Sequence, residues 1–209
     1  DVPYVGSPLG AGALAMDKWA TKLVAGALGI PTAPARLLTR ADAHSYTFTH
    51  PVVVKPVAAG SSHGVTLVRE AAGLGPALDA AFAHDNRILV EDLVTGREID
   101  VAVLGRPDGS RIVAPALEIC VPEGEIFDHC AKYARPPDFL IPAPLDEVTR
   151  KDLEQAAASV YEALGCAGVA RIDFFLTARG PVLNEVNTTP GLTARSQVPR
   201  MFAAAGMSF

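Results

Sequence analysis

The sequence predicts an α+β fold, and two observations carry this prediction. Short apolar stretches typical of strands recur from about residue 32 to residue 104, with one helical stretch among them. A long helical pattern and then a hairpin pattern follow nearer the C-terminus. At 209 residues, 49% of them hydrophobic, the chain is long enough for one large domain or two small ones.

The segment AMDKWATKLVAGALGIP predicts an amphipathic helix of about three or four turns near the N-terminus. Gly29 and Pro31 end the pattern, because glycine favours the position after a helix and proline cannot continue one. The apolar residues at helical spacing, which we expect to be buried, are Met16, Trp19, Ala20, Leu23, Val24, Ala27 and Leu28.

Apolar runs flanked by turn residues mark the next elements. Residues 105–144 are rich in proline, glycine and acidic residues, which is typical of a loop that covers a ligand, although 111–120 is strand-like. Before this loop we expect a helix at about 70–83 and strands over residues 51–55, 64–68, 87–94 and 98–105.

A second amphipathic helix is expected from Asp146 to Leu164. Asp146 is a favourable residue for the helix N-terminus, and Gly165 is favourable just after the C-terminus. The expected buried face of this helix consists of Val148, Leu153, Ala157, Val160 and Leu164.

Residues 170–177 and 181–187 predict a hairpin, with Ala178, Arg179 and Gly180 as its loop. In that register Thr177 faces Pro181, Asp173 lies opposite Glu185 and Arg171 lies opposite Asn187. Alternation along the strands assigns Arg171, Asp173, Phe175, Leu183, Glu185 and Asn187 to one face, and Ile172, Phe174, Leu176, Val182 and Val186 to the core face.

Two carboxylates directly opposite each other, Asp173 and Glu185, would destabilise the hairpin unless a cation lies between them. Carboxylates and an amide carbonyl are the hard oxygen ligands that suit Mg²⁺. The alternative, which spacing alone leaves open, is that Asp173 simply pairs with Arg171 or with a lysine on a solvated face.

The segment PVVVKPVAAGSSHGV is a candidate phosphate site, because its small residues allow backbone N–H groups to approach an anion. Lys55, at the end of the preceding strand, would add a point charge. A Walker lysine follows its glycine loop, whereas Lys55 precedes this one, so the segment is not a P-loop. A plain turn is the alternative for this segment.

An acidic strand end follows in VEDLVTGREID, which is compatible with a purine edge and a ribose, although a solvated turn would explain it equally well. A lysine with a glycine loop, an acidic strand end and a carboxylate pair, in that order, together predict a nucleotide triphosphate site.

Composition argues against several classes of protein. The net charge of −5 and the pI near 5.5 disfavour a nucleic-acid partner. We find no apolar run long enough to span a bilayer and no N-terminal leader, so no membrane association is expected. Three scattered cysteines, an odd number, suggest reduced thiols and a cytoplasmic location.

Six segments spread over nearly the whole chain read AMDKWATK, VVVKPVAAGSSHGV, VEDLVTGREI, AKY, ARIDFF and NEVNTTPGLTARS. They resemble successive motifs of the D-alanine–D-alanine ligases, members of the ATP-grasp superfamily. The resemblance implies an ATP-grasp fold of two α+β subdomains with the nucleotide between them. Residues 1–18 would form a linker and the start of the first helix, 19–96 the central lid subdomain, and 97–209 the C-terminal catalytic subdomain.

The resemblance also implies contacts to ATP. Lys18, Lys55 and Lys132 would reach the phosphates, and the backbone around Ser61 and Ser62 would close over them.

At the base and sugar, Glu91 and Val94 would present main-chain groups to adenine, and Glu98 would bind the ribose hydroxyls. Two Mg²⁺ ions, with Mn²⁺ as an alternative, would be held by Asp173, Glu185 and Asn187.

In such enzymes ATP phosphorylates the carboxylate of one D-alanine, and the amine of a second D-alanine attacks the acyl phosphate. Arg171 together with Mg²⁺ would offset the developing charge. Backbone at Gly191 would help form the oxyanion site, Ser196 would bind the carboxylate of the second substrate, and Gln197 would lie near it.

Ser61 and Tyr133 would orient the first substrate and the mobile loop. Relatives that make D-alanyl-D-lactate typically lack the Lys-Tyr pair of this loop, so Tyr133 favours the peptide-forming activity. A purely structural tyrosine is the alternative.

Family members carry an additional N-terminal α/β domain that nothing in this sequence matches. We therefore expect the chain to lack a complete amino-acid site and to have little activity alone, within a protein that is a homodimer. Two alternatives stay open: another ATP-grasp carboxylate–amine ligase from a biosynthetic pathway, and a nucleotide-binding module without chemistry.

Overall fold

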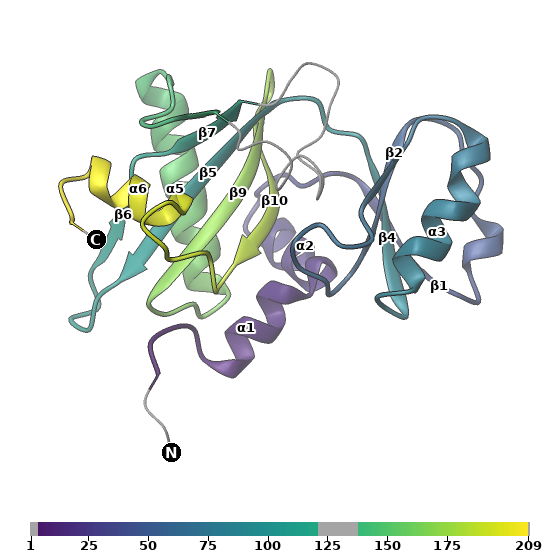
Figure 1. The fold of residues 1–209 in the computed structure, drawn as a ribbon, viewed down its shortest axis with the longest axis horizontal. Helices are drawn as coiled ribbons and strands as arrows, with labels where there is room; N and C mark the ends of the chain where they lie inside the picture. Colours follow the sequence, from purple (N-terminus) through teal and green to yellow (C-terminus); the bar gives the residue numbers. More distant parts are fainter. Residues whose placement is uncertain (1–3, 121–137, 209) are drawn as a thin grey trace.

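The structure, a computed structural model, describes residues 4–120 and 138–208. Two antiparallel sheets lie side by side, each with a helix packed against it (Figure 1). The α+β prediction is confirmed. Within the described residues, no helix is both long and apolar enough to cross a membrane.

The helices of the described chain are α1 (Leu9–Met16), α2 (Lys18–Ala27), α3 (Leu74–Phe82), α5 (Glu147–Ala163) and α6 (Gln197–Ala204). The strands are β1 (Ala35–Thr39), β2 (Val52–Pro56), β3 (Thr66–Val68), β4 (Arg87–Asp92), β5 (Arg97–Gly105), β6 (Arg111–Val113), β7 (Leu117–Cys120), β8 (Asp138–Leu140), β9 (Val169–Thr177) and β10 (Gly180–Asn187). Single 3₁₀ turns occur at Ala43–Ser45 and Ala71–Gly73.

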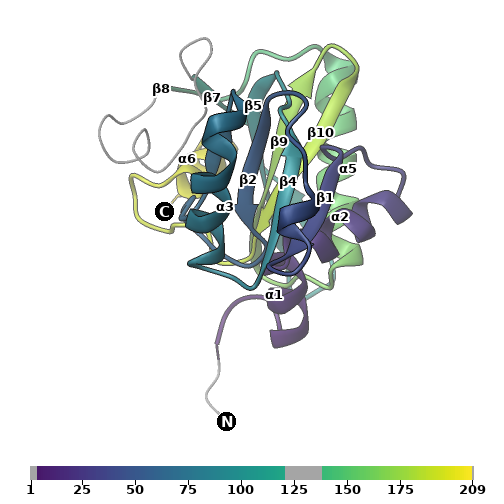
Figure 2. The ribbon, with the colours of Figure 1, turned by 90° about the vertical axis from the view of Figure 1, so that its right-hand side faces the viewer.

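The smaller sheet has the strand order β1-β4-β2-β3, and α3 covers one of its faces (Figure 2). Its core consists mainly of the alternating valines of β2 together with Leu38, Ile88 and Phe82. The sequence patterns did not predict β1, whose sequence ARLLT has no alternation and only one β-branched residue. Pairing with β4 along its whole length holds it in the sheet.

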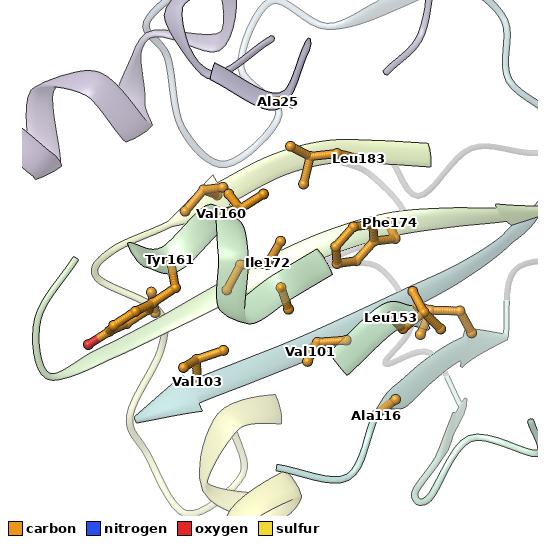
Figure 3. Close-up of a cluster of buried hydrophobic side chains, with 14 of the residues drawn as sticks. Ala25, Val101, Val103, Ala116, Leu153, Val160, Tyr161, Ile172, Phe174 and Leu183 are labelled. Carbon is orange, nitrogen blue, oxygen red and sulfur yellow. The ribbon is translucent and has the colours of Figure 1, made fainter. Parts of the chain in front are cut away.

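The larger sheet has the order β10-β9-β5-β7-β8, with β6 paired to β5. One face packs against α5 through Val101, Leu153, Val160, Ile172 and Phe174 (Figure 3). The opposite face packs against α6, a helix that the sequence patterns did not predict, through a cluster that includes Ala102, Leu117, Val198, Met201 and Phe202.

The predicted N-terminal helix is two helices. Asp17 is extended (ψ 98°) and separates α1 from α2, and its side chain accepts a hydrogen bond from Ala20 N to cap α2. The expected apolar face was wrong, because Met16 and Leu23 are 48% and 59% exposed. The buried face of α2 consists instead of Lys18, Thr21, Lys22 and Ala25.

The prediction for α5 is mostly confirmed. Asp146 accepts from Thr149 N, and Leu153, Ala157, Val160 and Leu164 are buried. Val148 was wrongly assigned to the buried face, since it lies in the first turn and is 70% exposed.

The β9–β10 hairpin has the predicted register at its polar end but not at its turn. Asp173 lies opposite Glu185, and Arg171 lies opposite Asn187, as predicted. The loop is one residue shorter than expected, because Gly180 already pairs with Thr177. A β-bulge at Asn184 compensates for the missing loop residue.

The bulge also corrects the assignment of faces before it. Leu183 was predicted on the polar face, but it pairs with Phe174 and is buried in the core. Val182 was predicted in the core, but it lies opposite Phe175 and is half-buried.

Candidate functional site

A row of three carboxylates crosses the larger sheet. Glu185 on β10 lies opposite Asp173 on β9, and Asp173 lies opposite Asp100 on β5. Asp173 and Asp100 are 8% and 2% exposed. Directly opposed carboxylates on one face repel each other, so this row requires positive charge.

Arg171 supplies part of that charge. Its Nε and one terminal nitrogen donate to Asp173 at 2.7 and 2.8 Å, and its Nε lies 3.3 Å from Asp100 Oδ2. Burial by itself lowers the pKa of Arg171, but the charges of Asp173 and Asp100 outweigh it and raise the pKa overall. The expected alternative of an Asp173–Arg171 pair is therefore present, although in a buried rather than a solvated setting.

Asp100 was not among the predicted site residues. Burial, and then the charge of Asp173, raise its pKa well above 3.8, and its Oδ2 makes no hydrogen bond among the described residues. The alternation of Glu98 and Asp100 against buried Ile99 and Val101 was the available signal.

Asn187 and Gln197 complete the surroundings of this row. Asn187 Nδ2 donates to Asp173 Oδ2 at 2.9 Å, and Arg171 donates to Gln197 Oε1 at the start of α6. Gln197 was predicted near the second substrate, but its hydrogen bond with Arg171 was not predicted.

Gly191 and Ser196 lie against each other in the segment before α6. A side chain at Gly191 would bring its Cβ to 2.9 Å from Ser196 Oγ, so a larger residue there would displace the Ser196 side chain. Ser196 Oγ is also 2.9 Å from Thr193 Oγ1 and accepts from Thr193 N. The two predicted substrate residues therefore share one small surface.

The loop between β2 and β3 contains Ser61 and Ser62, both in the left-handed region with φ of 53° and 57°. Non-glycine residues adopt this conformation rarely, and strained backbone of this kind gathers at ligand sites. Lys18 Nζ donates to Ala59 O at 2.7 Å, which connects the start of α2 to this loop.

A buried cluster of Lys22, Lys55 and Glu91 joins α2, β2 and β4. Lys22 Nζ lies 2.9 Å from Glu91 Oε1, and Lys55 Nζ lies 2.6 Å from Glu91 Oε2. Burial alone would raise the pKa of Glu91, but the charges of the two lysines outweigh it and lower the pKa. The pKa of Lys22 is lowered overall, because burial and the charge of Lys55 together outweigh the effect of Glu91.

The sequence motifs assigned only main-chain contacts to Glu91 and did not single out Lys22. The signal for Lys22 was its position four residues after Lys18, on a helix face shared with Thr21 and Ala25.

The junction between the two sheets brings lysines near the smaller sheet close to polar residues of β10 in the larger sheet. Lys55 Nζ approaches Asn184 Oδ1 at 3.4 Å, and Lys18 Nζ lies 3.8 Å from Glu185 Oε2. Lysines of α2 and β2 therefore reach the hairpin that carries the carboxylates.

The connection between β4 and β5 passes from one sheet to the other. Val94 lies in this connection, Glu98 is the second residue of β5, and both are half-buried. Gly96 lies against β9, since an added Cβ would be 2.7 Å from Leu176 O. Two further predicted residues, Lys132 and Tyr133, lie outside the described residues.

The donors present fit a divalent cation of the Mg²⁺ type. Asp173, Glu185 and Asn187 provide carboxylate and amide oxygens on one face, which are hard ligands. Among the described residues, no group of three histidine, cysteine, aspartate or glutamate side chains has the arrangement of a metal site.

Comparison with known proteins identifies the family. A family profile described as "D-ala D-ala ligase C-terminus" matches residues 24–209. The chain belongs to this family. Among the curated ligases, the D-alanine–D-alanine ligase of Corynebacterium urealyticum is 42% identical over 214 residues, covering 99% of this chain and 59% of that protein. That of Anaeromyxobacter dehalogenans strain 2CP-1 is 43% identical, covering 100% and 68%.

Two solved structures of ligases share the fold. The VanG D-Ala:D-Ser ligase from Enterococcus faecalis gives a TM-score of 0.88 at 36% identity, covering 99% of this chain and 62% of that one. D-alanyl-alanine synthetase A from Vibrio cholerae gives 0.86 at 30% identity, covering 100% and 66%. The expected ATP-grasp fold is thereby confirmed. The chain spans about 60% of the length of the first curated relatives.

Proposed function

We propose that the chain carries the ATP- and metal-binding part of a D-alanine–D-alanine ligase, which forms D-alanyl-D-alanine for peptidoglycan precursors. The observation that carries this proposal is the meeting of Lys18 and Lys55 with the hairpin of Asp173 and Glu185. Positive charge from one sheet and metal-type oxygens from the other match the needs of a triphosphate with its cation.

The nucleotide would lie between residues 19–96 and 97–209, the two expected ATP-grasp subdomains. Three features support this position: the strained backbone at Ser61 and Ser62, the sheet-to-sheet connection at Val94, and Glu98 beyond it. Backbone groups near Glu91 and Val94 would meet the adenine, and Glu98 the ribose. Lys132 would approach the phosphates.

Asp173, Glu185 and Asn187 would hold two Mg²⁺ ions, with Mn²⁺ as an alternative. When bound, these ions would neutralise phosphate oxygens and orient the transferred phosphoryl group.

Arg171 would stabilise negative charge on the phosphoryl group and on the tetrahedral carbon. Its guanidinium is already oriented by Asp173 and Gln197, so little reorganisation is needed during the reaction. The backbone at Gly191 would contribute to the same oxyanion site.

Ser196 would bind the carboxylate of the second D-alanine, and its contact with Gly191 supports one shared acceptor site. Ser61 and Tyr133 would orient the first substrate. The family resemblance supports the remaining expectations, a homodimeric and cytoplasmic protein.

The test is a ligation assay with ATP, Mg²⁺ and D-alanine, in which both ADP and the dipeptide are measured. The chain is assayed alone and after fusion to the N-terminal part of the Corynebacterium urealyticum ligase, because it spans 59% of that relative. We expect little product from the chain alone and D-alanyl-D-alanine from the fusion. Absence of both ADP release and ATP binding in the fusion would contradict the proposal.

A second acceptor is worth testing because one similar structure is a D-Ala:D-Ser ligase. Replacing half of the D-alanine by D-serine in the same assay distinguishes the two acceptors. We expect the mixed dipeptide to be the minor product.

A further inference from the structure

The buried cluster of Lys22, Lys55 and Glu91 has an unequal number of charges. Two ammonium groups share one carboxylate, and the three residues are only 9%, 5% and 4% exposed. Among the residues that the structure describes, the charged groups that shift the pKa of Lys22 are Glu91 and Lys55. With all three groups ionised, the cluster has a net charge of +1.

A buried excess charge is costly unless a partner of opposite sign compensates it. The cost is visible at Lys22, whose pKa is lowered overall, first by burial and also by the charge of Lys55, against the opposing effect of Glu91. If this cluster only stabilised the fold, one lysine paired with one glutamate, or apolar residues of similar volume, would do so at a lower cost in desolvation. The excess cation therefore points to an anion that binds from outside the cluster.

The two lysines are not equivalent in position. Lys22 Nζ donates to Ala33 O at 2.9 Å, within the part of the chain that precedes the smaller sheet. Lys55 Nζ reaches toward the larger sheet, where it approaches Asn184 Oδ1 at 3.4 Å. Lys55 is thus the member of the cluster that faces the junction between the sheets.

Each oxygen of Glu91 lies against a different lysine: Oε1 against Lys22 and Oε2 against Lys55. Removal of Lys22 would leave Glu91 and Lys55 as a one-to-one pair, which neutralises the charge of Lys55. The presence of Lys22 prevents this full neutralisation.

We propose that Lys22 is a positioning residue for nucleotide binding, which occupies half of the Glu91 carboxylate and so leaves the positive charge of Lys55 available to a phosphate group. This inference rests on the proposed use of ATP and concerns a residue that ends the segment AMDKWATK but to which the resemblance assigned no role. If the inference is correct, the effect of Lys22 on nucleotide affinity requires both the negative charge of Glu91 and the phosphates of the ligand.

The experiment measures the affinity of the 209-residue chain for ADP and for adenosine by isothermal titration calorimetry at pH 7. The ratio of the two affinities isolates the contribution of the phosphates. The variants are Lys22→Met, Glu91→Gln and the double variant, in which the cluster charge is 0, +2 and +1. Lys151→Met is the matched control, since it removes a lysine from the exposed surface of α5.

We expect Lys22→Met to lower the ADP-to-adenosine ratio by about tenfold, as for loss of one charge-assisted hydrogen bond. Glu91→Gln should raise the ratio. The double variant should return it to within about threefold of the wild-type value, and Lys151→Met should leave it unchanged. A ratio that is unchanged in Lys22→Met, or not restored in the double variant, overturns the inference.

If Lys22→Met does not fold, the Glu91→Gln and Lys22→Arg variants decide the question. Lys22→Arg keeps the charge and should keep the ratio, whereas an unchanged ratio in Glu91→Gln overturns the inference. A wild-type chain that binds neither ADP nor adenosine refutes the proposed function as well. Normal ADP binding with a ratio insensitive to the cluster charge refutes the role of Lys22 alone.

Discussion

At the scale of single residues, the proposed role of Glu185 as a metal ligand can be tested directly by substitution. We expect Glu185→Gln to abolish ligation by the fusion with the N-terminal part of the Corynebacterium urealyticum ligase. It should also weaken Mg²⁺ binding in the ADP complex by at least about 10- to 100-fold, the range found even for groups that only support a metal ligand. The substitution removes a charge but no core atom, so thermal unfolding without Mg²⁺ should change little. Magnesium titration of the ADP complex measures the effect.

Glu154→Gln is the matched control, because Glu154 pairs with Arg150 on the surface of α5. It should leave the Mg²⁺ titration unchanged. Full Mg²⁺ affinity in Glu185→Gln would contradict the assignment of this residue as a ligand.

Glu91 makes the stability of the fold sensitive to acid. Its pKa in the folded chain is lowered from 4.5 by the two lysines, so its charged form stabilises the fold. This contribution is complete above about pH 4.5, the usual value of the unfolded chain, and is lost as the pH falls through the lower folded value. Urea unfolding from pH 6 to pH 3 should therefore show a shallower loss of stability in Glu91→Gln than in the wild type. Parallel curves would contradict this prediction.

The sequence could predict the acidic residues of β9 and β10, but not the partners that fold around them. Asp173, Glu185 and Asn187 follow from alternation within one hairpin. Asp100 lies on β5, Gln197 begins α6, and Asn184 forms the bulge in β10. Their contacts with Asp173, Arg171 and Lys55 depend on tertiary structure, which the alternation within one hairpin cannot show.

At the level of elements, the core face of β9 packs in the hydrophobic cluster between the larger sheet and α5. Phe174 is 1% exposed and packs in the cluster under α5 (Figure 3). We expect Phe174→Ala to lower the free energy of unfolding by about 3 to 5 kcal/mol, measured by urea denaturation. Phe175→Ala, at the adjacent half-buried position on the other face, should cost clearly less.

Elements with strong local signals were predicted well, and those held by their neighbours were not. Asp146 and the spacing of Leu153, Ala157 and Val160 were sufficient to place α5. In contrast, the apolar face expected for α2 was wrong because tertiary structure buries its two lysines and leaves Leu23 exposed. Periodicity of apolar residues cannot show that a charged face is the buried one.

At the level of the whole molecule, Gly96 lies in the connection between the two sheets and packs closely against β9. A methyl group there would be 2.7 Å from Leu176 O, and backbone cannot move as easily as a side chain. We expect Gly96→Ala to cost about 1 to 3 kcal/mol of stability and also to weaken ADP binding, because the junction between the sheets must shift. Urea denaturation and calorimetry measure the two effects.

Gly26→Ala provides the control, since Gly26 lies in α2 with no atom within 4 Å of an added Cβ. It should stabilise the chain by up to about 1 kcal/mol and leave ADP binding unchanged. Equal behaviour of the two variants would contradict the role given to Gly96.

The irregularity at Asn184 has a consequence for anyone who engineers this chain. Pairing before it runs Leu183 to Phe174, and pairing after it resumes with Glu185 to Asp173, so deletion of Asn184 would leave an unbroken ladder with both faces intact. The hairpin would gain regularity, yet the side chain that approaches Lys55 would be gone. We therefore expect deletion of Asn184 to preserve the pairing of β9 with β10 and to weaken the contact between the two sheets.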